Sequence, residues 1–246
     1  MKKILLFFLQ CLVLTPCFSQ TVGEEVRFLT RNQGLYSGVV TDVATDTFLV
    51  QFQPLELSLP LSVGQYPARM KQFSNKPGKE ITELGDEVEN RLQEAAVNII
   101  NQWIQQCSFP ESSVTGCCFR FAELEDCSLY LFYTSRGYDF ISTDYHIVKI
   151  ELTGSPRLNP FSSAAVAENV KPKNRHPIVE ISKHVNSAVY DEDQFRNKAE
   201  WNNQPQYMDG LQFCFVDERK PAFQQSLEQV RKAFDFLYQS CQKRKR

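Results

Sequence analysis

Residues 81–107, ITELGDEVENRLQEAAVNIINQWIQQC, carry the longest helical pattern in the chain and decide its fold. Their apolar residues recur at intervals of three and four, which predicts an amphipathic helix. Gly85 costs about 1 kcal/mol inside a helix, so we expect the helix to begin near Asp86. A polar Pro/Gly stretch precedes the helix and Pro110 follows it, so 74–110 is predicted to be a linker and a long helix. The apolar positions are Ile81, Leu84, Val88, Leu92, Ala95, Ile99, Trp103 and Cys107.

Short strand patterns precede this helix. The runs 26–29, 35–43 and 47–52 are rich in β-branched and aromatic residues, and polar turn residues separate them. Three prolines then follow, and proline is confined to loops and to the edges of sheets. The region 20–73 is therefore predicted to be a small β module, with edges or loops at Pro54, Pro60 and Pro67.

Strand patterns also follow the helix, so the predicted fold class is α+β. The stretch 153–177 carries polar clusters and four prolines, and it predicts a long loop. A one-sided apolar stripe from Phe223 to Cys241 predicts a last helix. The expected strands of this part lie at 118–121, 129–133, 138–141, 145–152, 178–181, near 188–190 and at 211–216.

The first β module resembles a known fold. Its strand Tyr36-Ser-Gly-Val-Val, followed by the strand Phe48-Leu-Val-Gln-Phe52, is similar to the SH3-like barrel of Tudor and agenet type. The resemblance implies a β-barrel over 20–73 whose groove or cage aromatics are Tyr36, Phe48, Phe52 and Tyr66. Such a cage holds cations through its ring faces. Alternating aromatics in a small barrel more often form the core, so both interpretations stay open.

The last part resembles a second known fold. Several antiparallel strands followed by one amphipathic helix is the element order of the pleckstrin-homology-like fold, in which the helix closes one end of a bent sheet. Residues 215–237, FVDERKPAFQQSLEQVRKAFDFL, look like the closing strand and helix of such domains. The resemblance implies a PH-like domain over 111–246, closed by the C-terminal helix.

Residues 1–19 predict where the protein works. Lys2 and Lys3 precede a short apolar run, and small residues stand before a cut between Ser19 and Gln20, which is the layout of a secretory signal peptide. The Lys-Lys start and the Ser-Gln cut resemble signal peptides of Bacteroidota. We expect an exported protein, periplasmic or extracellular. The alternative is a lipoprotein, because Leu14-Thr-Pro-Cys17 resembles a lipobox, whose cysteine is acylated.

Charge argues against nucleic acid as a partner. The chain has 27 basic and 29 acidic residues, and loss of the two leader lysines leaves 25 against 29, a net charge of about −4. No overall positive field exists to hold a polyanion. The one dense basic cluster is the tail Lys243, Arg244, Lys245 and Arg246. This tail either complements the dipole of the preceding helix or contacts anionic lipid head groups.

Six cysteines remain after the leader is removed, and an even number in an exported chain permits disulfides. Cys107 ends the long helix and Cys117 or Cys118 opens a strand, so a bridge that closes this loop is geometrically reasonable. We expect one or two bridges, with the other cysteines as small buried residues. The candidates are Cys107, Cys117, Cys118, Cys127, Cys214 and Cys241.

No catalytic motif is present in the sequence. It has no Gly-x-Ser-x-Gly, no phosphate loop, no His-Glu-x-x-His and no Cys-x-x-Cys. The scattered cysteines and histidines lack the spacing of a zinc site, so we expect no metal and no cofactor. The catalytic alternative is a thiol enzyme with Cys127 or Cys214 as nucleophile and His146 or His184 as base.

The expected function is therefore non-catalytic binding of a protein or peptide at the cell envelope. Both suspected folds present grooves, and a few aromatic anchors carry most of the binding energy at such surfaces. Trp201 and Tyr207 form a second aromatic group in a polar segment, where exposed aromatics indicate a contact surface. The alternative interpretation is that these rings anchor the segment to the domain.

Overall fold

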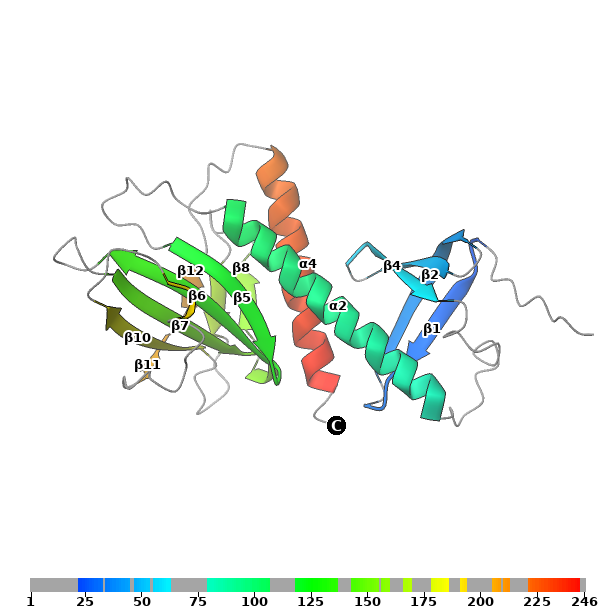
Figure 1. Ribbon diagram of the computed structural model, residues 1–246, viewed down its shortest axis with the longest axis horizontal. Helices are drawn as coiled ribbons and strands as arrows, with labels where there is room; N and C mark the ends of the chain where they lie inside the picture. The colour runs from blue at the N-terminus through cyan, green and yellow to red at the C-terminus, as the bar shows by residue number, and fades with distance from the viewer. Residues whose placement is uncertain are drawn as a thin grey trace, which may run out of the picture.

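The structure is a computed structural model with two larger antiparallel sheets, a third small sheet, and a long helix between the two larger sheets (Figure 1). A second helix lies beside the first, and the α+β class is confirmed at this level. The leader, Cys17, Tyr66 and Trp201 lie outside the described residues. The described residues are 22–32, 34–44, 47–53, 55–62, 79–106, 118–136, 143–154, 156–159, 166–169, 178–185, 191–193, 205–208, 210–212 and 221–243.

The first sheet is an antiparallel meander in the order β1-β2-β3-β4. Period-two alternation buries one face, as the sequence predicts for strands with one face against a core. Pro60 lies in β4 at the edge of this sheet, where the missing N–H costs no ladder bond. The expected closure into a barrel is not shown, since β1 and β4 are opposite edges of the described ladder. The strands are β1 (Glu25–Leu29), β2 (Leu35–Val43), β3 (Thr47–Phe52) and β4 (Leu57–Ser62).

Helix α2 (Lys79–Gln106) begins before the predicted start near Asp86, and Gly85 lies inside it at a close contact with β1. A Cβ at Gly85 would lie 2.1 Å from the carbonyl oxygen of Leu29, at the end of β1. The missing side chain allows helix and strand backbones to approach closely. The predicted start near Asp86 was therefore wrong, since it counted the cost of glycine and not this contact.

Polar side chains of α2 contact three parts of the fold in chain order. Tyr36 donates from its hydroxyl to Glu89 at 2.8 Å, which joins the first sheet to the helix. Gln93 donates to the hydroxyl of Ser240 at 3.0 Å, which joins the middle of α2 to the last helix. The Asn101 amide accepts from Ala122 N at 2.6 Å and donates to Ala122 O at 3.1 Å. These contacts fix the position of α2 against both sheets.

The second sheet has the order β11-β10-β7-β6-β5, and a third small sheet has the order β12-β9-β8. The long loop predicted over 153–177 was wrong in part, because β8 and β9 lie within it and pair with each other. The expected strands at 138–141 and near 188–190, and residues 213–216 of the last one, lie outside the described residues. The elements are β5 (Cys118–Glu125), β6 (Ser128–Arg136), β7 (Thr143–Glu151), η2 (Leu152–Gly154), β8 (Pro156–Asn159), β9 (Val166–Asn169), β10 (Ile178–Val185), β11 (Gln206–Tyr207) and β12 (Gly210–Gln212).

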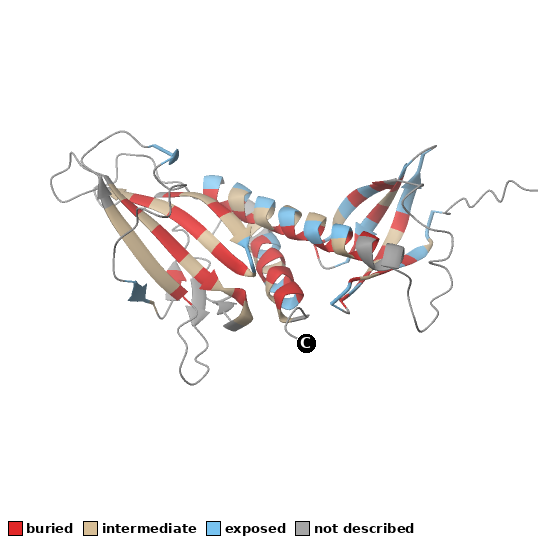
Figure 2. Ribbon diagram, turned by 60° about the horizontal axis from the view of Figure 1, so that its bottom comes forward, coloured by how far each residue is buried: buried red, intermediate tan, exposed pale blue. Residues whose placement is uncertain are grey.

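One contiguous hydrophobic cluster connects the two β regions. Helix α4 (Pro221–Lys243) lies along α2, and its Phe236 ring is 5.9 Å from the ring of Tyr36 in β2. Buried residues form a band along α2, with exposed residues on its other side (Figure 2). The cluster draws on both larger sheets and both helices, so the two β regions share a core. Neither described helix is long and apolar enough to cross a membrane.

The disulfide between Cys127 and Cys241 joins the β5–β6 turn to α4, with Cα atoms 5.5 Å apart. Asp126 and Cys127 both have positive φ, as a two-residue type I′ hairpin turn requires. This conformation costs a non-glycine residue about 1–2 kcal/mol, so the bond to α4 supports a strained turn. One bridge expected for an exported chain is thus present. Cys107, Cys117, Cys214 and the side chain of Cys118 lie outside the description.

Replacing Gly85 by alanine is predicted to destabilise the protein, although alanine is the better helix former by about 1 kcal/mol. The new methyl group would meet the Leu29 carbonyl oxygen, and overpacking of this kind costs about 1–3 kcal/mol. Urea unfolding should therefore move to lower urea. Gln102→Ala, at an exposed position of the same helix, is the control and should stay near wild type. A raised midpoint for Gly85→Ala would contradict the close contact with β1.

The double variant Cys127→Ser, Cys241→Ser is predicted to lose about 2–4 kcal/mol of unfolding free energy, because the bond closes a long loop in the unfolded chain. The two cysteines are 114 residues apart. The comparison is urea unfolding with and without reductant. Wild type and variant should differ only without reductant, and equal oxidised stabilities would show that the bond does not stabilise the fold.

Candidate functional site

The described residues form two candidate sites. The first, called the polar chain below, is the row of hydrogen-bonded side chains Ser135, His146 and Glu180 on the five-stranded sheet. Ser135 lies on β6, His146 on β7 and Glu180 on β10. Side chains two apart on a strand share a face, so Ser135 lies on the face of Leu129 and Leu131, which are fully buried. The polar chain therefore continues the face that carries the main hydrophobic cluster.

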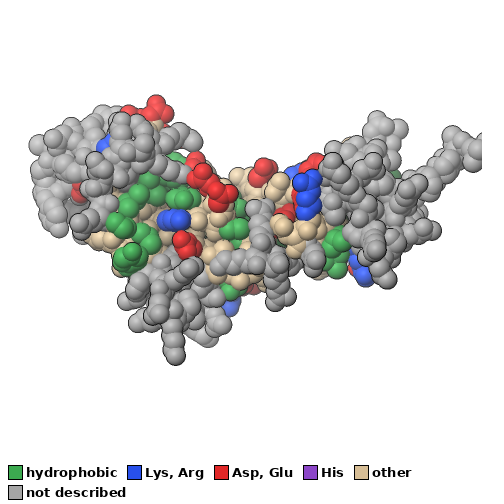
Figure 3. All heavy atoms as spheres, turned by 90° about the horizontal axis from the view of Figure 1, so that it is seen from below, with side chains coloured by type: hydrophobic (Ala, Val, Ile, Leu, Met, Phe, Trp, Pro, Cys, Tyr) green, Lys and Arg blue, Asp and Glu red, His purple; other side chains and the backbone are tan. Residues whose placement is uncertain are grey.

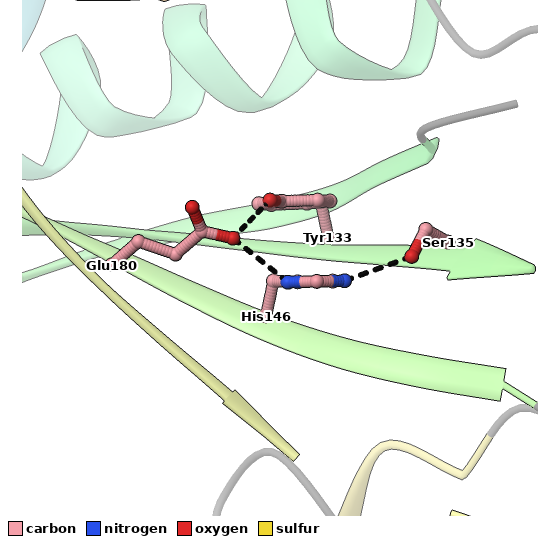
Figure 4. Close-up of polar contacts among 4 residues, drawn as sticks. All are labelled: Tyr133, Ser135, His146 and Glu180. Carbon is pink, nitrogen blue, oxygen red and sulfur yellow. Dashed lines mark hydrogen bonds and ion pairs between the residues drawn. The ribbon is translucent and has the colours of Figure 1, made fainter. Parts of the chain in front are cut away.

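The three polar side chains are joined by two hydrogen bonds (Figure 4). The Ser135 hydroxyl lies 2.8 Å from Nε2 of His146, and Nδ1 of His146 lies 2.8 Å from Oε1 of Glu180. Tyr133 donates its hydroxyl to the same carboxylate oxygen. Its ring stacks on the imidazole with centroids 4.3 Å apart and planes 3° from parallel. The ring of His146 is thus held by a carboxylate, a hydroxyl and an aromatic face.

The charge on Glu180 sets the direction of these hydrogen bonds. The hydrogen bond from His146 lowers the pKa of Glu180 most, and the Tyr133 hydrogen bond and the His146 charge add to this effect. Burial acts in the opposite direction, and the pKa stays below its ordinary value. An ionised carboxylate only accepts, so Nδ1 of His146 carries a hydrogen. In the neutral imidazole Nε2 then accepts from the Ser135 hydroxyl.

The second candidate site is an open groove of about 830 Å³ between α2 and β5. Three glutamates and several residues with side-chain amides line it, and none of the lining residues that the structure describes is basic. Asn90, Glu94 and Asn98 are exposed on α2 at a spacing of four, which places them on one stripe of the helix. The lining consists of Asn90, Gln93, Glu94, Val97, Asn98, Asn101, Ala122, Glu123, Leu124 and Glu125.

Three of the expected cage aromatics lie in the core. Tyr36, Phe48 and Phe52 are only 4%, 1% and 0% exposed. Their rings pack with other hydrophobic residues, Phe52 on Phe28 at 5.6 Å for example. A cation would have to enter the core to reach them, so the structure favours the alternative interpretation, that they are core residues. The fourth, Tyr66, lies outside the described residues.

The second aromatic group is described only in part. Tyr207 is 64% exposed and sits in β11, opposite Val179 at the edge of the second sheet. Trp201 lies outside the described residues. A contact role for these two residues stays a prediction.

The thiol hypothesis loses one of its two nucleophiles. Cys127 is bonded to Cys241, so its sulfur is not a free thiolate, and the hypothesis was wrong for this residue. Cys214 and the side chain of His184 lie outside the description. His146 does contact a hydroxyl, but it is that of Ser135. Sequence reasoning missed Ser135 and Glu180, because strand register alone brings them to His146.

Two observations concern other ligand classes. In the described part of the chain, no group of three or more His, Cys, Asp or Glu side chains is placed to hold a metal ion. On the face shown in Figure 3, acidic and basic side chains are interspersed along the middle of the molecule. No large basic patch is visible among the described side chains of that face. That no nucleic acid binds stays a prediction.

Glu180→Gln is predicted to destabilise the protein at neutral pH and to flatten its acid unfolding. A carboxylate with a lowered folded-state pKa stabilises above its unfolded pKa, and this stability is lost as pH falls through the folded value. Urea midpoints between about pH 7 and pH 3 should therefore fall less steeply in the variant than in wild type. Glu87→Gln, at an exposed position of α2, should keep the wild-type slope. An unchanged slope for Glu180→Gln would contradict the interaction with His146.

The comparisons with known proteins add no assignment to this geometry. No family model, no curated protein and no solved structure matches the chain. The two sites therefore have to be interpreted from their own residues.

Proposed function

We propose that this chain is an exported binding protein, and that the groove between α2 and β5 binds a protein or peptide of the cell envelope without catalysing a reaction on it. The first sheet would be an SH3-like module and the last part a PH-like domain with its C-terminal helix. Export rests on the leader pattern of residues 1–19.

The observation that carries the proposal is the groove itself. Its volume of about 830 Å³ lies within the usual range of ligand sites, about 300–1,000 Å³. It is open to solvent, so a segment of a larger partner could enter. It also lies beside the edge strand β5, where Asn101 already occupies the outward backbone groups of Ala122, so a peptide would bind through side chains of the groove.

The residues that line the groove indicate which ligand residues it would bind. Three of the described residues that line the groove are glutamates, Glu94, Glu123 and Glu125, and none of these described lining residues is a lysine or arginine. A ligand segment with lysine or arginine side chains complements these charges, and complementary potentials favour both encounter and register. Asn90 and Asn98 add amides that donate and accept, which suits the backbone of an extended peptide.

The walls of the groove are held in place before any ligand arrives. Gln93 forms a hydrogen bond with Ser240, and Asn101 forms hydrogen bonds with the backbone N–H and C=O of Ala122. The β5–β6 turn directly after Glu125 is tied to α4 through Cys127. A site that is already ordered loses less conformational entropy on binding, so modest contacts give usable affinity.

Glu94→Lys is predicted to weaken binding of a basic peptide about three- to tenfold, because it replaces an attraction by a repulsion inside the groove. The assay is fluorescence polarisation with a labelled lysine-rich peptide, and its glutamate-rich counterpart serves as the ligand control. Glu87→Lys is the matched protein control, since Glu87 is exposed on the same helix and does not line the groove.

The outcome separates binding in the groove from attraction to any acidic surface. Equal losses for Glu94→Lys and Glu87→Lys would mean that only net charge matters, and the groove would not be the site. Tighter binding of the glutamate-rich peptide than of the lysine-rich one would contradict the proposed ligand chemistry.

A further inference from the structure

We propose that Ser135 is a nucleophilic serine activated by His146, and that this pair cleaves carboxylic esters. This activity goes beyond the proposed binding function. It uses residues of β6, β7 and β10, whereas the groove is lined by α2 and β5. The two sites share no residue, so either can fail in experiment without the other.

The geometry meets the requirement for an activated nucleophile. A serine hydroxyl needs a base within hydrogen-bond reach, and the base needs a third group that orients it. The Ser135 hydroxyl is 2.8 Å from Nε2 of His146, and Glu180 is 2.8 Å from Nδ1. Because Nδ1 donates its hydrogen to the carboxylate of Glu180, Nε2 is the nitrogen that accepts the serine proton. This order of hydroxyl, imidazole and carboxylate recurs on unrelated folds and is recognised by geometry.

The surroundings keep the imidazole in this orientation. Tyr133 stacks flat on the ring of His146 and also donates to Glu180. His146 and Glu180 are each 15% exposed in their side chains, and Ser135 is partly exposed at the end of the chain of hydrogen bonds. Ser135 is thus less enclosed than a core residue, and the carboxylate behind the imidazole is partly shielded from water.

The reaction balances with water as the only co-reactant. The Ser135 oxygen forms a bond to the carbonyl carbon of the ester, and its proton moves to Nε2 of His146. The carbon–oxygen bond to the alcohol then breaks, and the alcohol leaves with the proton from Nε2. Water attacks the acyl-serine in the same way, with His146 carrying the proton, which releases the carboxylic acid and restores Ser135.

In this scheme Ser135 and His146 are the catalytic residues, and Glu180 is a positioning residue. Glu180 acts by fixing the tautomer and orientation of the imidazole. Its loss should slow the reaction of Ser135, and Glu180→Asp should recover part of the rate, because it restores a carboxylate. If Glu180 had a purely structural role, Glu180→Gln and Glu180→Asp would slow the reaction of Ser135 equally.

The test is labelling of the full folded chain with a biotinylated fluorophosphonate, followed by mass spectrometry of the modified peptide. The probe should form a phosphonate ester on Ser135 with loss of fluoride. His146→Gln should slow this labelling at least about 100-fold, the lower end of what general base catalysis contributes. Ser182→Ala is the matched control, because Ser182 lies opposite His146 on the neighbouring strand. It should label at the wild-type rate.

Labelling of the wild-type protein alone tests whether Ser135 is an activated nucleophile, so a folding defect in a variant does not affect this test. An adduct on Ser135 that disappears in urea supports an activated serine. Absence of an adduct, an adduct on another residue, or equal labelling in urea would overturn the proposal. Release of p-nitrophenolate from p-nitrophenyl acetate, lost in Ser135→Ala and kept in Ser182→Ala, would confirm the ester as substrate class. No release by a wild-type protein that does label would overturn that class.

Discussion

The rest of the structure depends on the packing of helix α2 between two sheets. Its apolar residues enter one cluster with both β regions, and its polar residues contact the first sheet, α4 and β5 in turn. The buried contact of Tyr36 with Glu89 is part of this arrangement. Leaving a buried carboxylate without its partner costs more than the bond itself gains, so such contacts fix the placement of α2.

Both candidate sites depend on this placement. One wall of the groove is a stripe of α2, and the other is β5, whose backbone is bonded to Asn101. The polar chain lies on β6, β7 and β10, on the sheet face whose buried part belongs to the shared cluster. The disulfide to α4 adds a covalent tie at the β5–β6 turn.

The sequence predicted the helices and strands better than the contacts between them. Apolar spacing located both helices, and β-branched runs located most strands, because local periodicity reports which face is buried. The role of Gly85 was not predictable, since it depends on the approach of a strand far away in the sequence. The chain of Ser135, His146 and Glu180 was missed for the same reason, because only the pairing register brings these three strands together. The buried aromatics Phe48 and Phe52 carry the same alternation as a cage would, so pattern alone could not separate core from groove.

The central claim is that the two β regions share one core through α2. Hydrogen exchange of backbone amides in rising urea tests it most directly, since it measures the free energy of opening for each segment. The account predicts that amides of β3 and β7 reach the same opening free energy and join one global transition as urea rises. An opening of β3 with clearly lower free energy, while β7 stays protected, would show that the first sheet unfolds independently and would contradict the shared core.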